Sequence, residues 1–128
     1  MSVRSWFHPT TWWPPLLLLL VVLTGWQAAA DRAGLKIHVE GLPPMSHMSF
    51  GYRNGLELET LYTQLMLEKG FLASVLYWPS LAHKEQHLDR FLEAMDQAFQ
   101  VCGQAIRDGQ VESLLKGPVR HADFHRLT

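Results

Sequence analysis

The stretch KEQHLDRFLEAMDQAFQVCGQAIRD, residues 84–108, carries the strongest fold signal in this sequence. Its apolar residues recur at the i, i+3, i+4, i+7 spacing that places side chains on one face of a helix. This face comprises Leu88, Phe91, Leu92, Met95, Ala98, Phe99, Cys102, Ala105 and Ile106. The pattern predicts an amphipathic helix of about five turns that Gly109 ends, because glycine readily adopts the left-handed conformation of a helix stop.

Shorter elements are expected on either side of this helix. Alternation of apolar and polar side chains predicts a strand over 35–40, which Gly41-Leu42-Pro43-Pro44 interrupts, and a second strand is expected over 45–50. The spacing of Leu58, Leu61, Tyr62, Leu65 and Met66 predicts a helix over 57–69. The apolar run 71–78 indicates a buried strand or strand pair, and a short helix is expected over 111–116.

This order of elements predicts an α+β fold of two layers. Helices that cover one face of a small antiparallel sheet satisfy the succession strand, strand, helix, strand, long helix, short helix. The length of 128 residues suits one domain, and 48% hydrophobic against 18% charged residues argues against disorder. The net charge of −1 and the lack of a basic stripe argue against a nucleic-acid partner.

The N-terminal 25 residues differ from the rest and admit two interpretations. Leu16 to Leu23 is too short for a membrane span, which needs about 20 residues, but it matches the core of a secretory signal. Cleavage before Asp31 would then produce a small secreted or membrane-associated binding protein. Alternatively, residues 26–33 form the end of a helix that Gly34 stops. We prefer the second interpretation because of the family resemblance described below, which includes residues 26–35. That resemblance implies one domain over 26–128 and a cytoplasmic location, and it leaves the segment 1–25 unmatched.

Seven histidines raise the question of a metal site. His83 and His87 are four residues apart, as are His121 and His125, so each pair could share a helical face. The zinc-protease motif requires Glu directly after the first His, where this chain has Lys84. Solvated surface histidines are therefore expected, with no metal-binding residue.

Cysteine and lysine side chains are the other candidates for chemistry. Cys102 lies on the apolar face of the long helix, where burial raises a thiol pKa and makes it inert. A Schiff-base lysine must lie desolvated in a pocket. The four lysines occupy a strand's polar face, helix ends and a Gly-Pro turn, positions that favour solvent: Lys36, Lys69, Lys84 and Lys116. We therefore expect no catalytic and no cofactor-binding residue.

Five segments nevertheless resemble, in order, the C-terminal portion of class III pyridoxal-phosphate aminotransferases of the glutamate-1-semialdehyde 2,1-aminomutase type. They resemble the end of the helix before the small domain, a G-x-P-P…F strand segment, a helix followed by a G-[FIV]-L-A-S strand, the start of the long helix, and the closing segment. The matching residues are 28–35, 41–50, 61–74, 80–83 with 88–94, and 117–121 with 124–127. Relatives usually have Thr where this chain has Lys84, which cannot accept the free N–H bonds at a helix start.

The resemblance implies the small domain of a transaminase or isomerase without its catalytic part. In the family, the lysine that binds pyridoxal phosphate, the aspartate at the pyridine nitrogen and the phosphate-binding turn belong to a preceding large domain. The chain would therefore be inactive alone, would hold no cofactor, and would need the missing large domain or the homodimer partner of the parent enzyme. Neither nucleic acid nor a membrane is an expected partner.

Overall fold

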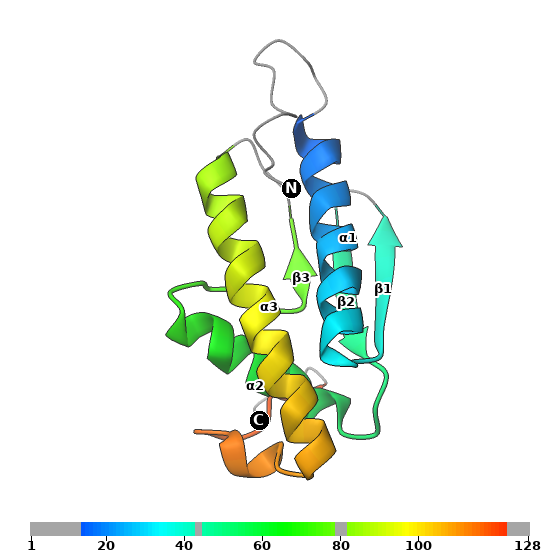
Figure 1. Cartoon of the computed structure of the whole chain (residues 1–128), viewed down its shortest axis with the longest axis vertical. Coiled ribbons are helices and arrows are strands. Elements are labelled where there is room, and N and C mark those ends of the chain that lie inside the picture. Colours follow the sequence, from blue (N-terminus) through cyan, green and yellow to red (C-terminus); the bar gives the residue numbers. More distant parts are fainter. Residues whose placement is uncertain (1–13, 43–44, 79–81, 123–128) are drawn as a thin grey trace, which may run out of the picture.

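The computed structural model describes residues 14–42, 45–78 and 82–122. Within them the chain forms helix α1 (Pro14–Ala33), strands β1 (Ile37–Leu42) and β2 (Met45–Phe50), and helix α2 (Gly55–Glu68). Strand β3 (Leu76–Tyr77), helix α3 (Glu85–Asp108) and the 3₁₀ helix η2 (Glu112–Leu114) follow. The α+β fold class is confirmed, because α1 and α3 lie side by side on one face of a small antiparallel sheet (Figure 1).

The sheet has the strand order β1-β2-β3. β1 and β2 pair over six residues, from Ile37 opposite Phe50 to Leu42 opposite Met45. β3 pairs with β2 over only two residues, Ser46 with Tyr77 and His47 with Leu76. Because side chains alternate along a strand, Ser46, Met48 and Phe50 face the helices and are buried.

The first strand lies two residues later than predicted. Leu35 closes the end of α1 instead, since its N–H donates to the Ala30 carbonyl at 2.8 Å, and Gly34 adopts the expected positive φ of 68°. At the other end the strand continues through Gly41, where a break was predicted. A Cβ on Gly41 would lie 2.3 Å from the Met45 carbonyl oxygen, so only glycine fits this tight hairpin.

The prediction of a strand or strand pair over 71–78 is correct only for Leu76 and Tyr77. The Phe71 N–H still bonds to the Met66 carbonyl at the end of α2, and the Ser74 hydroxyl accepts the Leu76 N–H at 3.2 Å. These local bonds replace ladder bonds over the first half of the run. Leu72 is 96% exposed, so apolar composition here does not mean burial.

Both predicted long helices are confirmed within two residues. α2 crosses α3 near the sheet end in Figure 1 and buries Leu58, Leu61, Tyr62 and Met66. α3 starts at Glu85 after Lys84, whose side chain makes no cap bond. The His87 Nδ1 atom accepts the Lys84 N–H at 3.4 Å and so supplies part of the missing cap. Ser80, which could cap the helix in place of Lys84, lies outside the described residues. The predicted helix over 111–116 is reduced to η2.

The core joins all three helices to the sheet. Trp26 from α1, Phe50 from β2, Tyr62 from α2 and Phe99 from α3 are at most 5% exposed, and the last three form edge or tilted ring contacts at 5.4–6.4 Å. Burial raises the pKa of Tyr62, and the nearby Trp26 indole N–H opposes this rise. Neither the Tyr62 hydroxyl nor the indole N–H makes a well-formed hydrogen bond among the described residues.

Helix α1 is longer than the predicted 26–33 segment. It runs without interruption across the boundary placed between Gly25 and Trp26, and Val22, upstream of that boundary, is fully buried. Residues 14–25 and 26–33 therefore belong to one helix, α1, which packs on α3. Among the described residues, the structure holds no helix with both the length and the apolar character needed to span a membrane.

Candidate functional site

The four lysines lie where a Schiff base would not form readily. Lys36, Lys84 and Lys116 are exposed, and Lys116 pairs with Glu68 at 2.7 Å. Lys69 is half-buried, but its ammonium group donates to the Gln97 side chain rather than facing a cavity. A pyridoxal-phosphate aldimine needs a desolvated amine of lowered pKa. The residues of this chain do not fit that cofactor, and we derive no reaction step through it.

Cys102 lies where the sequence predicted, on the buried face of α3. Its side chain is fully buried, and burial raises the pKa of the thiol to about 12. Because the thiolate is the nucleophilic form, such a thiol is unreactive near neutral pH. The prediction that this cysteine packs in the core is confirmed.

Of the five histidines in the described part of the chain, four are exposed as expected and His47 is half-buried, but one pair has an unexpected position. His83 precedes α3 and His87 lies in its first turn, so the two do not share a helical face, and yet both line one pocket. His121 is exposed, and His125 lies outside the described residues. In the part of the chain that the structure describes, no group of three or more His, Cys, Asp or Glu side chains is arranged to bind a metal ion.

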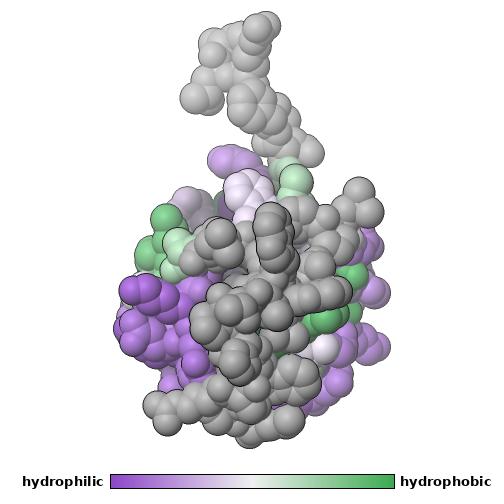
Figure 2. Space-filling view, turned by 90° about the horizontal axis from the view of Figure 1, so that it is seen from above, coloured by the Kyte–Doolittle hydropathy of each residue, from purple (hydrophilic) through white to green (hydrophobic). Residues whose placement is uncertain are grey.

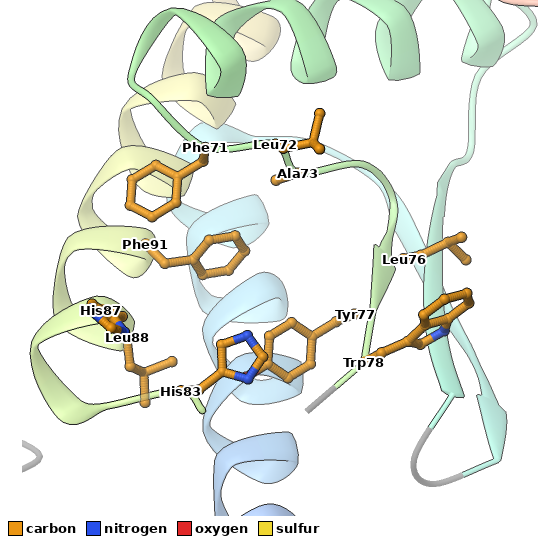
Figure 3. A pocket seen from close by; sticks show the side chains of 10 residues that line it. All are labelled: Phe71, Leu72, Ala73, Leu76, Tyr77, Trp78, His83, His87, Leu88 and Phe91. Carbon is orange, nitrogen blue, oxygen red and sulfur yellow. The ribbon is translucent and has the colours of Figure 1, made fainter. Parts of the chain in front are cut away.

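That pocket, which we call the aromatic pocket, lies between β3, the loop after α2 and the first turns of α3 (Figure 3). Its volume is about 250 Å³. It is lined by Phe71, Leu72, Ala73, Leu76, Tyr77, Trp78, His83, His87, Leu88 and Phe91. The sequence analysis missed it, because the run 71–78 was assigned to a buried strand rather than to the wall of a cavity.

Rings make most of the wall contacts in the aromatic pocket. Phe91 packs edge-on against Phe71 with ring centroids 5.7 Å apart, and lies 6.1 Å from Tyr77. The His83 ring lies 5.8 Å from Tyr77. The Arg90 guanidinium covers Phe71 at 5.9 Å, a cation–π contact. Tyr77 is 8% exposed, and its hydroxyl makes no hydrogen bond.

A second hollow of about 680 Å³ lies where the C-terminal residues 114–120, here called the strap, run along α2. Gln64 holds the strap by donating to the Leu114 carbonyl at 3.0 Å and accepting the Lys116 N–H at 2.8 Å. Arg120 pairs with Glu59 at 2.5 Å. Burial raises the pKa of Glu59, and Arg120 and His47 oppose the rise. These bonds hold the strap along α2, and the Arg120 and Glu59 charges beside the hollow are paired with each other.

The open face of the sheet carries exposed apolar side chains. Figure 3 shows Leu76 and Trp78 pointing to the opposite side of β3 from Tyr77. They are 49% and 61% exposed, and Met45, which alternation places on the same face of β2, is 62% exposed. Seen from above, hydrophobic residues are visible on two sides of the molecule, each beside hydrophilic ones (Figure 2). We call Met45, Leu76 and Trp78 the open-face patch.

Comparison with known proteins leaves the chain without an assigned family. No protein-family model matches it, and no curated protein matches it.

Proposed function

We propose that this chain is the C-terminal small domain of a class III aminotransferase of the glutamate-1-semialdehyde aminomutase type, and that it acts by docking on a catalytic large domain. The proposal rests on one observation above all. Four of the five sequence segments that resemble the family fall, in order, on successive helices and strands of a two-layer domain, and the fifth follows η2 and lies partly outside the described residues.

The segment 28–35 covers the end of α1, and 41–50 covers the last two residues of β1 and all of β2. The segment 61–74 covers the second half of α2 and the loop behind it, and 88–94 lies in the first half of α3. Helix α1 leads directly into the small antiparallel sheet. This arrangement suits a domain that is joined to a larger one through this helix. Chemistry by this chain alone is not part of the proposal, since its lysines face solvent or a side-chain amide.

The open-face patch is the docking surface that we assign to the large domain. A solvated face of an antiparallel sheet is normally polar, whereas Leu76, Trp78 and Met45 leave apolar area in water. Burying such side chains against a partner contributes roughly 25 cal/mol per Å² of apolar surface.

We also propose a cytoplasmic location. A signal peptidase that cut before Asp31 would remove Val22 and Trp26, which are fully buried, from the core. A chain that lost them would expose the facing side of α3. The secretory interpretation therefore requires a different fold from the one described.

The test is complementation. A panel of aminomutase and aminotransferase large domains, each produced without its own small domain, is mixed with the purified chain, and the aldimine absorbance and turnover are measured. We expect at least one to gain activity. Trp78→Glu should abolish the gain, whereas Val101→Glu, at an exposed apolar position of α3, should not. Failure with every large domain, or an internal aldimine on the purified chain alone, contradicts the proposal.

A further inference from the structure

The size of the aromatic pocket defines what could occupy it. Its volume is about 250 Å³, whereas an apolar cavity of about 150 Å³ is enough to hold benzene. One aromatic ring, or two fused rings, would therefore fill it. The ring contacts among Phe71, Phe91 and Tyr77 provide edges and faces for a flat molecule.

One polar atom in this apolar wall has no partner. The Tyr77 hydroxyl is shielded from solvent and makes no hydrogen bond to any described residue, although buried hydroxyl groups nearly always have a partner. Figure 3 shows the Tyr77 side chain pointing from β3 into the pocket, toward His83 and Phe91. Because water does not reach this oxygen, a ligand would contact it only after a lining side chain moved aside. The ligand would then satisfy a group whose burial otherwise destabilises the fold.

The mouth of the pocket is polar. His83 and His87 are exposed and line its rim, and Arg90 lies over Phe71 at the same end of α3. Asp89 faces another way, into a separate hollow that it shares with Glu85. The pocket thus combines an aromatic interior with one buried hydrogen-bonding group, and none of its lining residues carries a carboxylate.

We propose that the aromatic pocket binds a small aromatic molecule of one or two fused rings, with a polar ring substituent or ring N–H that hydrogen-bonds to the Tyr77 hydroxyl. The aromatic pocket and the open-face patch share Leu76 and Trp78 at their border. The inference nevertheless does not rest on the docking proposed above, because it uses only the aromatic interior of the pocket and the Tyr77 hydroxyl.

Indole and indene form a matched pair of probes, because they have the same shape and differ in the ring N–H. Each is titrated into the ¹⁵N-labelled full chain, and amide shifts are followed by NMR. We expect indole to bind with a Kd on the order of 1 mM or tighter. The shifts should centre on residues 71–73, 76–78 and 83–91. Indole should bind about fivefold more tightly than indene, because one neutral hydrogen bond changes the affinity by about that factor.

Three variants complete the test. Tyr77→Phe removes only the unpartnered hydroxyl, so it should keep the fold and lose the preference for indole. Tyr52→Phe is the control, because it removes a tyrosine hydroxyl that accepts the Lys36 N–H at 3.0 Å elsewhere in the chain, and the preference should persist. Ala73→Trp, which fills the pocket from its wall, should abolish binding of both probes.

Two outcomes would overturn the inference. Shifts that are absent, or that centre on residues away from the pocket, would show that the cavity does not accept aromatic molecules. A preference for indole that survives in Tyr77→Phe would show that the hydroxyl plays no part in recognition.

Discussion

A close contact between α1 and α3 offers a demanding test of the fold. Gly103 lies on the buried face of α3, and a Cβ placed there would lie 2.4 Å from the Ala33 carbonyl oxygen. Contacts below 3.0 Å essentially never occur for real Cβ atoms. The neighbouring Arg107 guanidinium donates to the same oxygen at 3.0 Å. Gly103→Ala must therefore push the two helices apart at the point where this bond forms.

Two opposing effects decide the magnitude. Alanine favours a helix interior over glycine by about 1 kcal/mol. Overpacking costs about 1–3 kcal/mol, and the strained bond from Arg107 to Ala33 adds about 1.5 kcal/mol or more, because the donor is charged. Together these contributions should lower the free energy of unfolding of Gly103→Ala by about 1.5–3.5 kcal/mol. At about 4 °C per kcal/mol, the Tm should fall by roughly 6–14 °C.

Urea denaturation followed by circular dichroism measures the effect, with Gly25→Ala as the matched control. Gly25 lies in the same helix pair, but its added Cβ would meet the Leu92 Cδ2 atom, the end of a flexible side chain, at 2.8 Å. The side chain can move, so the gain in helix propensity should leave Gly25→Ala within about 1 kcal/mol of wild type. Equal stability of Gly103→Ala and wild type, or equal losses in both variants, would refute the close packing of α1 on α3.

Three further predictions concern other parts of the core and the strap. Deletion of residues 1–30 removes Trp26 and its buried neighbours on α1, so the remaining chain should lose its cooperative unfolding transition in calorimetry. Burial raises the pKa of Cys102 from 9.0 to about 12, so the stability that the neutral thiol contributes is complete below pH 9 and is lost as the pH rises toward 12. Thiol reagents should label Cys102 at pH 8 only after denaturation. Arg120→Ala should cost about 1–2 kcal/mol in urea denaturation, because it leaves Glu59 partly desolvated without its partner.

Each of these predictions has a control. Cys102→Ala should remove this residue's part of the stability loss above pH 9, and native labelling of the thiol at a rate similar to that of the unfolded chain would contradict its burial. Arg120→Ala in a Glu59→Gln background should cost less than in wild type, since the carboxylate is gone. An unchanged cost would mean that the pair does not hold the strap. A cooperative transition in the chain starting at Asp31 would show that α1 is dispensable.

Local patterns in the sequence predicted the elements whose side chains repeat with a clear period. The helices over 57–69 and 84–108 and the strand over 45–50 all form within two residues of their expected limits. The burial of Cys102 followed from the same periodicity. Where no period existed, the prediction was poor: 71–78 is mostly loop, and the continuation of the N-terminal helix through residues 14–25 was not anticipated.

The sequence by itself therefore determined the fold class and the order of its helices and strands, because helix and strand periodicity arises from neighbours a few residues apart. The aromatic pocket, the contact of Gly103 with Ala33 and the bond between Arg120 and Glu59 were decided only by the tertiary structure. Each of them joins residues from different elements. Their mutual distances depend on how α1, α2 and α3 pack on the sheet, and no local pattern records that packing.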